Sequence, residues 1–198
     1  MPRLQEEAGT ALSEAPSSTG AGGRPGRRPA LLWLLGVVAA LVVVADQATK
    51  WLALQHLSPG EPHDVVGTWI RLNLIRNAGA AFSLGERSTW LLTIIAVAVL
   101  VAIVTVARRL GSTAWALALG LILGGAIGNL IDRFFREPGV GRGHVVDFID
   151  YFGLFIGNVA DIAIVTAAVL IAVLSLRGVP TSGEPAGRHT EETQDDPT

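Results

Sequence analysis

The chain has 198 residues, of which 50% are hydrophobic and 16% are charged, and a mean hydropathy of +0.48. These values exclude an ordinary soluble domain and indicate a membrane protein. The net charge of −2 says little about partners, whereas the absence of cysteine excludes disulfides, thiolate metal sites, a cysteine nucleophile and lipidation of the chain on cysteine.

Residues 1–29 are rich in Gly, Pro, Ser and charge, and they are predicted to be a disordered tail because they cannot bury enough apolar surface to fold. A mostly apolar run then covers residues 30–54. Within it, Val43-Val44-Ala45 would suit the cleavage site of a signal peptide. A membrane helix of about twenty residues fits better, because the run is long for a signal core and three more apolar segments follow. Asp46 and Lys50 share a helix face and can pair.

Residues 58–85 do not form a membrane span. Pro59, Gly60 and Pro62 break the preceding helix. In residues 70–74, apolar and polar side chains then alternate with a period of two, as they do in a half-buried strand. This segment predicts a small sheet lying on the bilayer surface.

Three further spans are expected at residues 90–107, 114–131 and 154–176. Small residues at intervals of four let helix backbones approach closely in lipid. The third span carries such a series: Gly120, Gly124 and Gly128. The loop 132–153 is expected at the interface, with a short helix or strand around residues 144–151.

Basic residues flank alternate ends of the four spans: Arg24, Arg27, Arg28, Arg108, Arg109, Arg177 and Arg188. By the positive-inside rule these ends are cytoplasmic, although three arginines of the loop 132–153 oppose the rule. The sequence therefore predicts an all-α integral membrane protein whose four transmembrane helices lie in residues 30–177. A small β-rich extracytoplasmic subdomain is expected between the first and second helices. The tails, residues 1–29 and 178–198, are expected to be disordered and cytoplasmic.

With this orientation, the conspicuous acids gather at the outer face of the membrane. Asn129 and Asp132 are three residues apart at one helix end, and Asn158 and Asp161 repeat that spacing. Helix caps would explain one such pair, but not two pairs together with the acid–base pair of the first span. Asp147 stands among bulky apolar residues, so its pKa is expected to be raised by desolvation, unless it is a surface acid on an amphipathic strand.

Other chemistries find little support in the sequence. His144 lacks neighbours with metal-ligand spacing, so neither a metal nor a cofactor is expected. No Gly-x-Ser-x-Gly, Ser/Lys pairing or phosphate loop is present, and nothing suggests nucleic acid as a partner. The acids alone would also suit a small transporter or channel subunit with an ion or proton relay, although inverted repeats are not evident. A non-catalytic membrane assembly factor is a third possibility.

Five short motifs follow one another over residues 31–176. They are Asp46-Gln47-x-Thr49-Lys50, Arg76-Asn77-x-Gly79-Ala80-Ala81-Phe82, Gly128-Asn129-x-x-Asp132-Arg133, Val145-Val146-Asp147-Phe148 and Asn158-x-Ala160-Asp161. With this order and four spans, the chain resembles lipoprotein signal peptidase (signal peptidase II), a family of bacterial inner-membrane aspartyl proteases. The chain departs from the family at Gly157, because a Phe commonly stands there.

The resemblance implies that Asp147 and Asp161 are the catalytic dyad of an aspartic endopeptidase. Such an enzyme removes signal peptides from diacylglyceryl-modified prolipoproteins and cleaves N-terminal to the lipidated cysteine. Around the dyad, the residues expected to bind substrate or order the site are Asn77, Asn129, Arg133 and Asn158. Those expected to support the site are Asp46, Lys50 and Asp132, the last pairing with an arginine, most simply Arg133.

The same resemblance implies partners and a location. The partners would be lipid-modified prolipoproteins and membrane lipids, and the enzyme is expected to act as a monomer. It would lie in the bacterial cytoplasmic membrane, with both termini in the cytoplasm and the active site at the outer leaflet.

Overall fold

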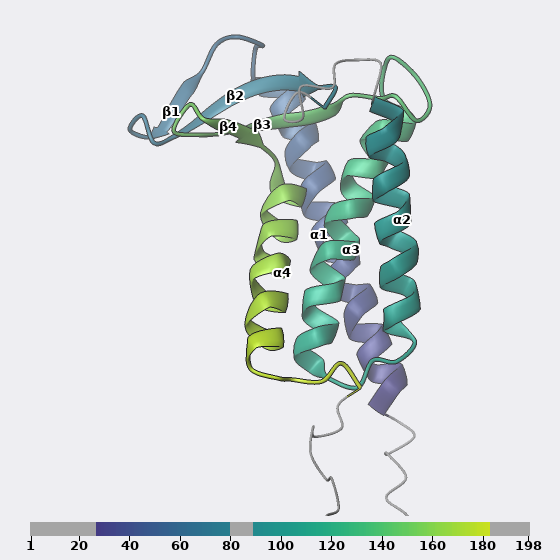
Figure 1. Ribbon diagram of the computed structural model, residues 1–198. Coiled ribbons are helices and arrows are strands. Elements are labelled where there is room, and N and C mark those ends of the chain that lie inside the picture. The colour runs from purple at the N-terminus through teal and green to yellow at the C-terminus, as the bar shows by residue number, and fades with distance from the viewer. Residues whose placement is uncertain (1–26, 80–88, 183–198) are drawn as a thin grey trace, which may run out of the picture.

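The computed structural model describes residues 27–79 and 89–182 of the chain. In these residues, four helices stand side by side, and a small sheet lies across one end of the bundle (Figure 1). The helices are α1 Arg27–His56, α2 Thr89–Ala107, α3 Thr113–Phe135 and α4 Val159–Leu176. All four are long and apolar enough to cross a membrane, as the sequence predicts. Most of the two predicted tails lies outside the described residues.

Helix α1 is longer than a membrane span requires. Its 30 residues extend over roughly 45 Å at about 1.5 Å per residue, whereas the hydrocarbon core is about 30 Å thick. The additional turns at its C-terminal end pack beneath the sheet, where Ala53 joins an apolar cluster with Leu74, Val146 and Phe148. The helix thus supports the sheet from below.

Helix α4 begins later than predicted. The sequence places the start of the fourth span at residue 154, but Phe155–Gly157 form strand β4 and the helix starts at Val159. Asn158 has extended backbone angles and caps the helix. The prediction of this boundary was wrong because a short apolar run suits a strand as well as a buried helix.

The sheet is wider than predicted. Its strands are β1 His63–Val66, β2 Ile70–Asn77, β3 Val145–Tyr151 and β4 Phe155–Gly157, antiparallel in the order β1-β2-β3-β4. The alternation in residues 70–74 correctly predicts β2. The sequence assigns the sheet to the segment between the first two helices, but β3 and β4 come from the segment between α3 and α4. The description of the fold as all-α is therefore too narrow.

Helix α3 is the centre of the bundle and packs against α1, α2 and α4. Its glycines allow this closeness, as the small-residue spacing predicts. A Cβ atom on Gly124 would lie 2.6 Å from the Cβ of Val42 and 2.7 Å from the carbonyl oxygen of Ala39, both on α1. A Cβ atom on Gly125 would lie 2.7 Å from the carbonyl oxygen of Ala160 on α4. Side chains at these positions would push the helices apart.

The start of the predicted C-terminal tail contacts the bundle. The backbone N–H of Gly111 donates to the carbonyl of Thr181 at 2.8 Å, and the indole N–H of Trp115 donates to the carbonyl of Val179 at 2.9 Å. Residues 179–181 therefore cross the turn between α2 and α3, at the end of the bundle opposite the sheet (Figure 1).

We predict that Gly124→Leu lowers the stability of the bundle by about 1–3 kcal/mol, because the new side chain overpacks the contact between α1 and α3. Thermal unfolding in detergent measures this effect. Gly36→Leu is the matched control, since Gly36 also lies in a membrane helix but has nothing within 4 Å of its Cβ position. Equal melting temperatures for the two variants would contradict the close packing of α3.

Candidate active site

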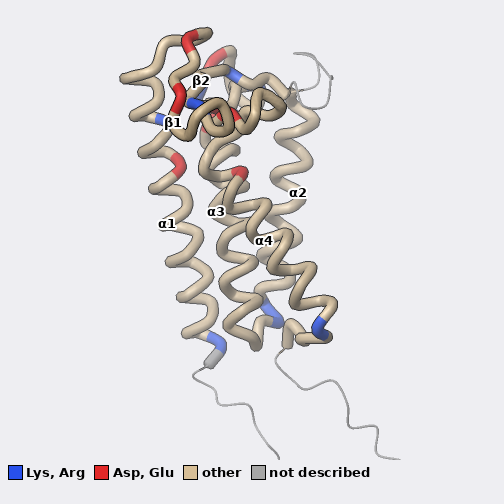
Figure 2. Tube along the Cα trace, turned by 90° about the vertical axis from the view of Figure 1, so that its left-hand side faces the viewer, with Lys and Arg blue, Asp and Glu red and all other residues tan. Residues whose placement is uncertain are grey.

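Acidic residues gather at the sheet end of the bundle (Figure 2). There α1 and α3 contact β3, and α4 begins. The structure brings together there the residues that the sequence selects. They are Asp46, Lys50, Asn77, Asn129, Asp132, Arg133, Asp147, Asn158 and Asp161. Besides α1, these residues come from β2, α3, β3 and the start of α4. The site therefore exists only in the folded chain.

The base of the site is a buried ion cluster. The ammonium of Lys50 lies 2.8 Å from Asp46 Oδ2 and 2.8 Å from Asp132 Oδ2, and all three side chains are 0% exposed. The predicted pairing of Asp46 with Lys50 is confirmed. Buried charges are costly unless they are paired and hydrogen-bonded, so these three residues depend on one another.

Asp132 pairs with a different arginine from the predicted one. The Nε–H of Arg136 donates to Asp132 Oδ1, whereas no bond joins Asp132 to Arg133. The expectation that Asp132 pairs with an arginine is confirmed, but the choice of Arg133 was wrong. Adjacent residues on a helix point in different directions, while residues four apart share a face. The backbone N–H of Val146 also donates to Asp132 Oδ2 at 3.1 Å, which ties strand β3 to α3.

Asp147 and Asp161 lie on either side of Asn158. The amide of Asn158 donates to Asp147 Oδ1 at 2.6 Å, and its backbone N–H donates to Asp161 Oδ2 at 3.1 Å. Asn77 donates to Asp147 Oδ2 at 2.7 Å, and Asn129 donates to Asp161 Oδ1 at 3.1 Å. Each carboxylate therefore accepts two N–H groups, and one residue touches both.

The spacing of Asn158 and Asp161 also forms a capping box at the start of α4. The side chain of Asn158 accepts from the backbone N–H of Asp161 at 3.0 Å, while Asp161 accepts from the backbone of Asn158. The two interpretations of this pair, a helix cap and a polar site, are therefore both correct. The cap fixes the position of Asp161, because it holds the carboxylate at the N-terminal end of the helix.

Burial raises the pKa of Asp147 to about 6, as its apolar neighbours in the sequence predict. The hydrogen bond from Asn77 opposes this rise, and the negative charge of Asp161 adds to it. The Asp147 side chain can therefore carry a proton close to neutral pH. Burial, followed by the charge of Asp161, also raises the pKa of Tyr151. Tyr151 is four residues after Asp147 on β3, so alternation along the strand puts both side chains on the same face.

The side chain of Arg133 has an unsatisfied hydrogen-bond donor. Among the described residues, its Nη1 atom is buried and has no hydrogen-bond partner. Arg133 lies within electrostatic reach of Asp147, Asp132 and Asp161. A buried donor without a partner costs stability, so this atom is suited to an acceptor that a bound substrate would supply.

Gly157, where the sequence departs from the motif that it resembles, lies beside Asp161. A Cβ atom there would be 2.7 Å from the ring of Phe155 and 2.9 Å from Asp161 Oδ2. The Phe155 ring thus occupies the space next to Gly157. The departure leaves the contacts of Asp161 with Asn129 and Asn158 in place.

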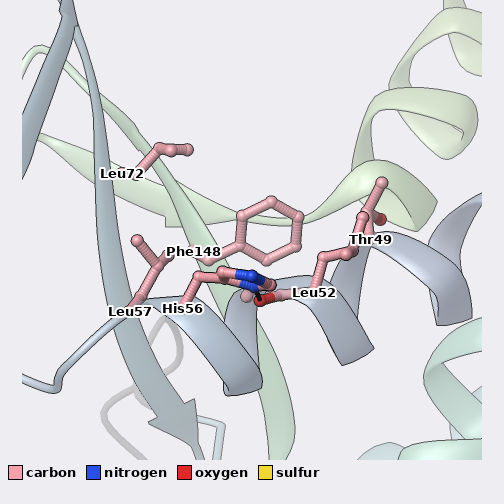
Figure 3. A pocket seen from close by; sticks show the side chains of 7 residues that line it. Thr49, Leu52, His56, Leu57, Leu72 and Phe148 are labelled. Atoms are coloured by element: carbon pink, nitrogen blue, oxygen red, sulfur yellow. Dashed lines mark hydrogen bonds between the residues drawn. The ribbon is translucent and has the colours of Figure 1, made fainter.

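An apolar pocket lies on the other face of β3 (Figure 3). Its lining residues are Thr49, Leu52, Ala53, His56, Leu57, Leu72 and Phe148. Successive strand residues point to opposite faces, so Asp147 faces away from this pocket. His56 is its one titratable group, and its Nδ1 lies 2.9 Å from the carbonyl of Leu52. No group of His, Cys, Asp or Glu with metal-site geometry occurs in residues 27–79 and 89–182.

Three further residues belong to the site although the sequence did not single them out: Gln47, Arg136 and Tyr151. Gln47 Nε2 donates to Asp46 Oδ2 at 3.1 Å and to the carbonyl of Gly128 at 3.0 Å, so it joins α1 to α3. Gln47 stands inside the first motif, and Arg136 is four residues after Asp132. Local spacing could therefore have identified both.

Comparison with known proteins gives one consistent result. The family model described as signal peptidase (SPase) II matches residues 38–177. Lipoprotein signal peptidase of Rhodococcus jostii (strain RHA1) is 49% identical over 154 residues, which are 78% of this chain and 78% of that protein. The corresponding protein of Mycobacterium tuberculosis (strain ATCC 25618 / H37Rv) is 49% identical over 150 residues, 76% of this chain and 74% of its own length.

A solved structure described as a bacterial membrane enzyme has a similar fold. Its TM-score is 0.62 at 29% sequence identity, and the match covers 71% of this chain and 91% of the other. A second such structure has a TM-score of 0.63 at 28% identity, with 77% and 92% covered.

We predict that Asp132→Asn destabilises the protein by about 3–5 kcal/mol, because it leaves the buried ammonium of Lys50 with one carboxylate fewer. The melting temperature in detergent should fall clearly, while folded molecules keep measurable activity. Glu137→Gln is the control, since Glu137 is 89% exposed and lies 3.7 Å from Arg76. A melting temperature for Asp132→Asn as high as that of the control would contradict the role of the buried cluster.

Proposed function

The chain belongs to the signal peptidase II family, and from this membership we propose that Asp147 and Asp161 are the catalytic pair with which it removes signal peptides from lipoprotein precursors. The observation that carries the proposal is the position of Asn158, which donates to both carboxylates. Two carboxylates are held by one residue, and burial raises the pKa of Asp147. This arrangement suits general acid–base hydrolysis.

The charges around the pair support the presence of one shared proton. Four carboxylates and three cations meet at this end of the bundle, which leaves one negative charge without a cation. They are Asp46, Asp132, Asp147, Asp161, Lys50, Arg133 and Arg136. A single proton on the dyad would balance the site. Buried sites disfavour unbalanced charge, and two nearby carboxylates do not ionise together readily.

Peptide hydrolysis on this pair needs no covalent intermediate. One carboxylate takes a proton from water as the water oxygen attacks the scissile carbonyl, and the other carboxyl gives its proton to the carbonyl oxygen. When the C–N bond breaks, the leaving nitrogen receives a proton from the first carboxyl, and a hydroxyl of the diol returns one to the second. The pair ends the reaction as it began.

The substrate would be a prolipoprotein with a diacylglyceryl-modified cysteine, cleaved N-terminal to that cysteine. The curated relatives are named lipoprotein signal peptidases, and the dyad lies where the helices end and the sheet begins. Asn77, Asn129 and Asn158 already donate to the two aspartates, so they would order the acids. The unpartnered nitrogen of Arg133 is better placed to bind a backbone carbonyl of the substrate.

The alternative of a transporter or channel subunit is not supported, because the family model and the curated relatives are those of a peptidase. Every residue of the proposed machinery comes from one chain, so a monomer suffices. Membrane lipids would surround the apolar helices.

We place both termini in the cytoplasm and the dyad at the outer leaflet of the bacterial cytoplasmic membrane. Basic residues mark the end of the bundle opposite the sheet, and the positive-inside rule makes that end cytoplasmic (Figure 2). Arg133 and Arg136 lie at the other end, against the rule. The charges of the carboxylate cluster account for both positions.

This orientation predicts the outcome of reporter fusions. Fusions at Gly111 and Gly178 should report the cytoplasm, and fusions at Gly60 and Gly139 should report the outside, because the two pairs lie at opposite ends of the bundle. A paired alkaline phosphatase and fluorescent reporter measures both states. A cytoplasmic signal from Gly139 would put the dyad on the wrong side.

We predict that Asp147→Asn and Asp161→Asn each reduce turnover by about 10²–10⁴-fold or more, because an amide keeps the size of the side chain but cannot exchange a proton. The double variant should be little worse than either single one, since the two residues act as a unit. The assay is cleavage of a lipidated precursor peptide by purified protein in detergent.

Asp150→Asn is the matched control for the dyad variants. Asp150 is another buried acid of β3, but it pairs with Arg71 at 2.6 Å and not with the dyad. Turnover per folded molecule should survive in this variant. Near wild-type cleavage by Asp147→Asn, with Asp132→Asn inactive, would instead assign the chemistry to Asp132 and Asp161.

A further inference from the structure

Lys50 connects the buried ion cluster to the dyad. Its ammonium has three protons and three acceptors: Asp46 Oδ2 and Asp132 Oδ2, each at 2.8 Å, and Asn129 Oδ1 at 3.0 Å. The first two bonds neutralise the lysine inside the cluster. The third leads out of the cluster, because Asn129 is itself a donor to Asp161.

The lysine determines which way the Asn129 amide points. Asn129 Oδ1 accepts from Lys50 and, at 3.2 Å, from Asn158, so its NH₂ group must face Asp161 Oδ1 at 3.1 Å. A flipped amide would set its NH₂ group against the ammonium and its oxygen against the carboxylate. Both contacts would be repulsive, so Lys50 holds the amide in the orientation that favours a negative Asp161.

The two carboxylates have different surroundings. Asp161 is in the first turn of α4 and accepts from the backbone N–H of Asn158, and the N-terminal end of a helix favours negative charge. Asp147 lies on a strand and accepts from the side-chain amides of Asn77 and Asn158. The helix terminus and the Asn129 amide, which is polarised by an ammonium, therefore act directly on Asp161, whereas the charge of Lys50 reaches Asp147 only through space.

We propose that Lys50 is a positioning residue that keeps Asp161 ionised through Asn129 and leaves the shared proton on Asp147. This proposal rests on the proposed function and assigns its two roles. Asp161 takes the proton from the attacking water, and Asp147 gives its proton to the carbonyl oxygen. On collapse of the diol, Asp161 protonates the leaving nitrogen and Asp147 recovers a proton from the diol hydroxyl.

The charged groups that face Lys50 and the dyad come from all the elements packed there. They are Asp46 of α1, Asp132 and Arg133 of α3, Arg136 directly after α3, Asp147 and Tyr151 of β3, and Asp161 of α4.

Two substitutions of opposite sign test the proposal through the pH dependence of kcat/KM for a lipidated precursor peptide. The acid limb of this pH profile is the fall in kcat/KM at low pH, where Asp161 becomes protonated. Lys50→Met removes a positive charge, so the acid limb should move up by about one pH unit. Asp46→Asn removes a negative charge, so the same limb should move down. The double variant should restore its position, and KM should change little. A merely structural role would lower activity in all three without opposite shifts.

Two further variants keep the test decisive. Asn129→Leu breaks the bridge without leaving a new buried charge and should move the acid limb up, as Lys50→Met does. Asp46→Asn retains the ion pair of Lys50 with Asp132, so it gives a result even where Lys50→Met does not fold. Asp150→Asn, which removes a buried carboxylate from the same strand, should leave the limb unmoved. Melting in detergent establishes that each variant is folded.

Folded variants whose acid limbs all coincide with that of the wild type would overturn the role of Lys50. If Asp147→Asn and Asp161→Asn are inactive in the same assay, the proposed function stands and this assignment alone fails. A folded wild type that does not cleave the peptide would overturn the proposed function, and this assignment with it.

Discussion

The burial of Lys50 between two carboxylates is the interaction on which the rest of the structure depends. A buried ammonium is tolerable only with full pairing, so Asp46 and Asp132 must stay within hydrogen-bond distance of it. The same two carboxylates accept the backbone N–H groups of Ala160 on α4 and Val146 on β3, at 3.0 Å and 3.1 Å. Two helices, α1 and α3, are thereby fixed in register, and the start of α4 and the strand of Asp147 are attached to them.

The depth of the cluster follows from its position along α1. Trp33 and Trp51 are exposed on this helix, and tryptophan favours the membrane interfaces. They are eighteen positions apart, which corresponds to roughly 27 Å of helix and is close to the hydrocarbon thickness of about 30 Å. Lys50 precedes Trp51 directly and so lies near the limit of the hydrocarbon at the sheet end of the bundle.

Features that depend on local spacing and composition could be predicted from the sequence. Four apolar segments, the strand near residues 70–74 and the pairing of Asp46 with Lys50 follow from runs and periodicities within single segments. The close approach through Gly124 follows in the same way, as does the raised pKa of Asp147, whose neighbours are all bulky and apolar. The pairing of Asp147 with Asp161 was different, because it came from the resemblance to a family and not from spacing.

Tertiary structure alone decided which distant segments meet. The four-stranded sheet joins two segments about seventy residues apart. The alternation within a segment predicts a strand but does not say with which distant strand it pairs. The start of α4 at Val159 is set by the hydrogen bonds of Asn158, some of which reach other elements. Asp132 pairs with Arg136 because residues four apart share a helix face, and it pairs with Lys50 because α1 packs against α3. Long-range hydrogen bonds and ion pairs form between residues whose proximity exists only after the helices have packed. The sequence could therefore supply the groups of this site and pairs four residues apart, such as Asp46 with Lys50, but not the partners that come from other segments.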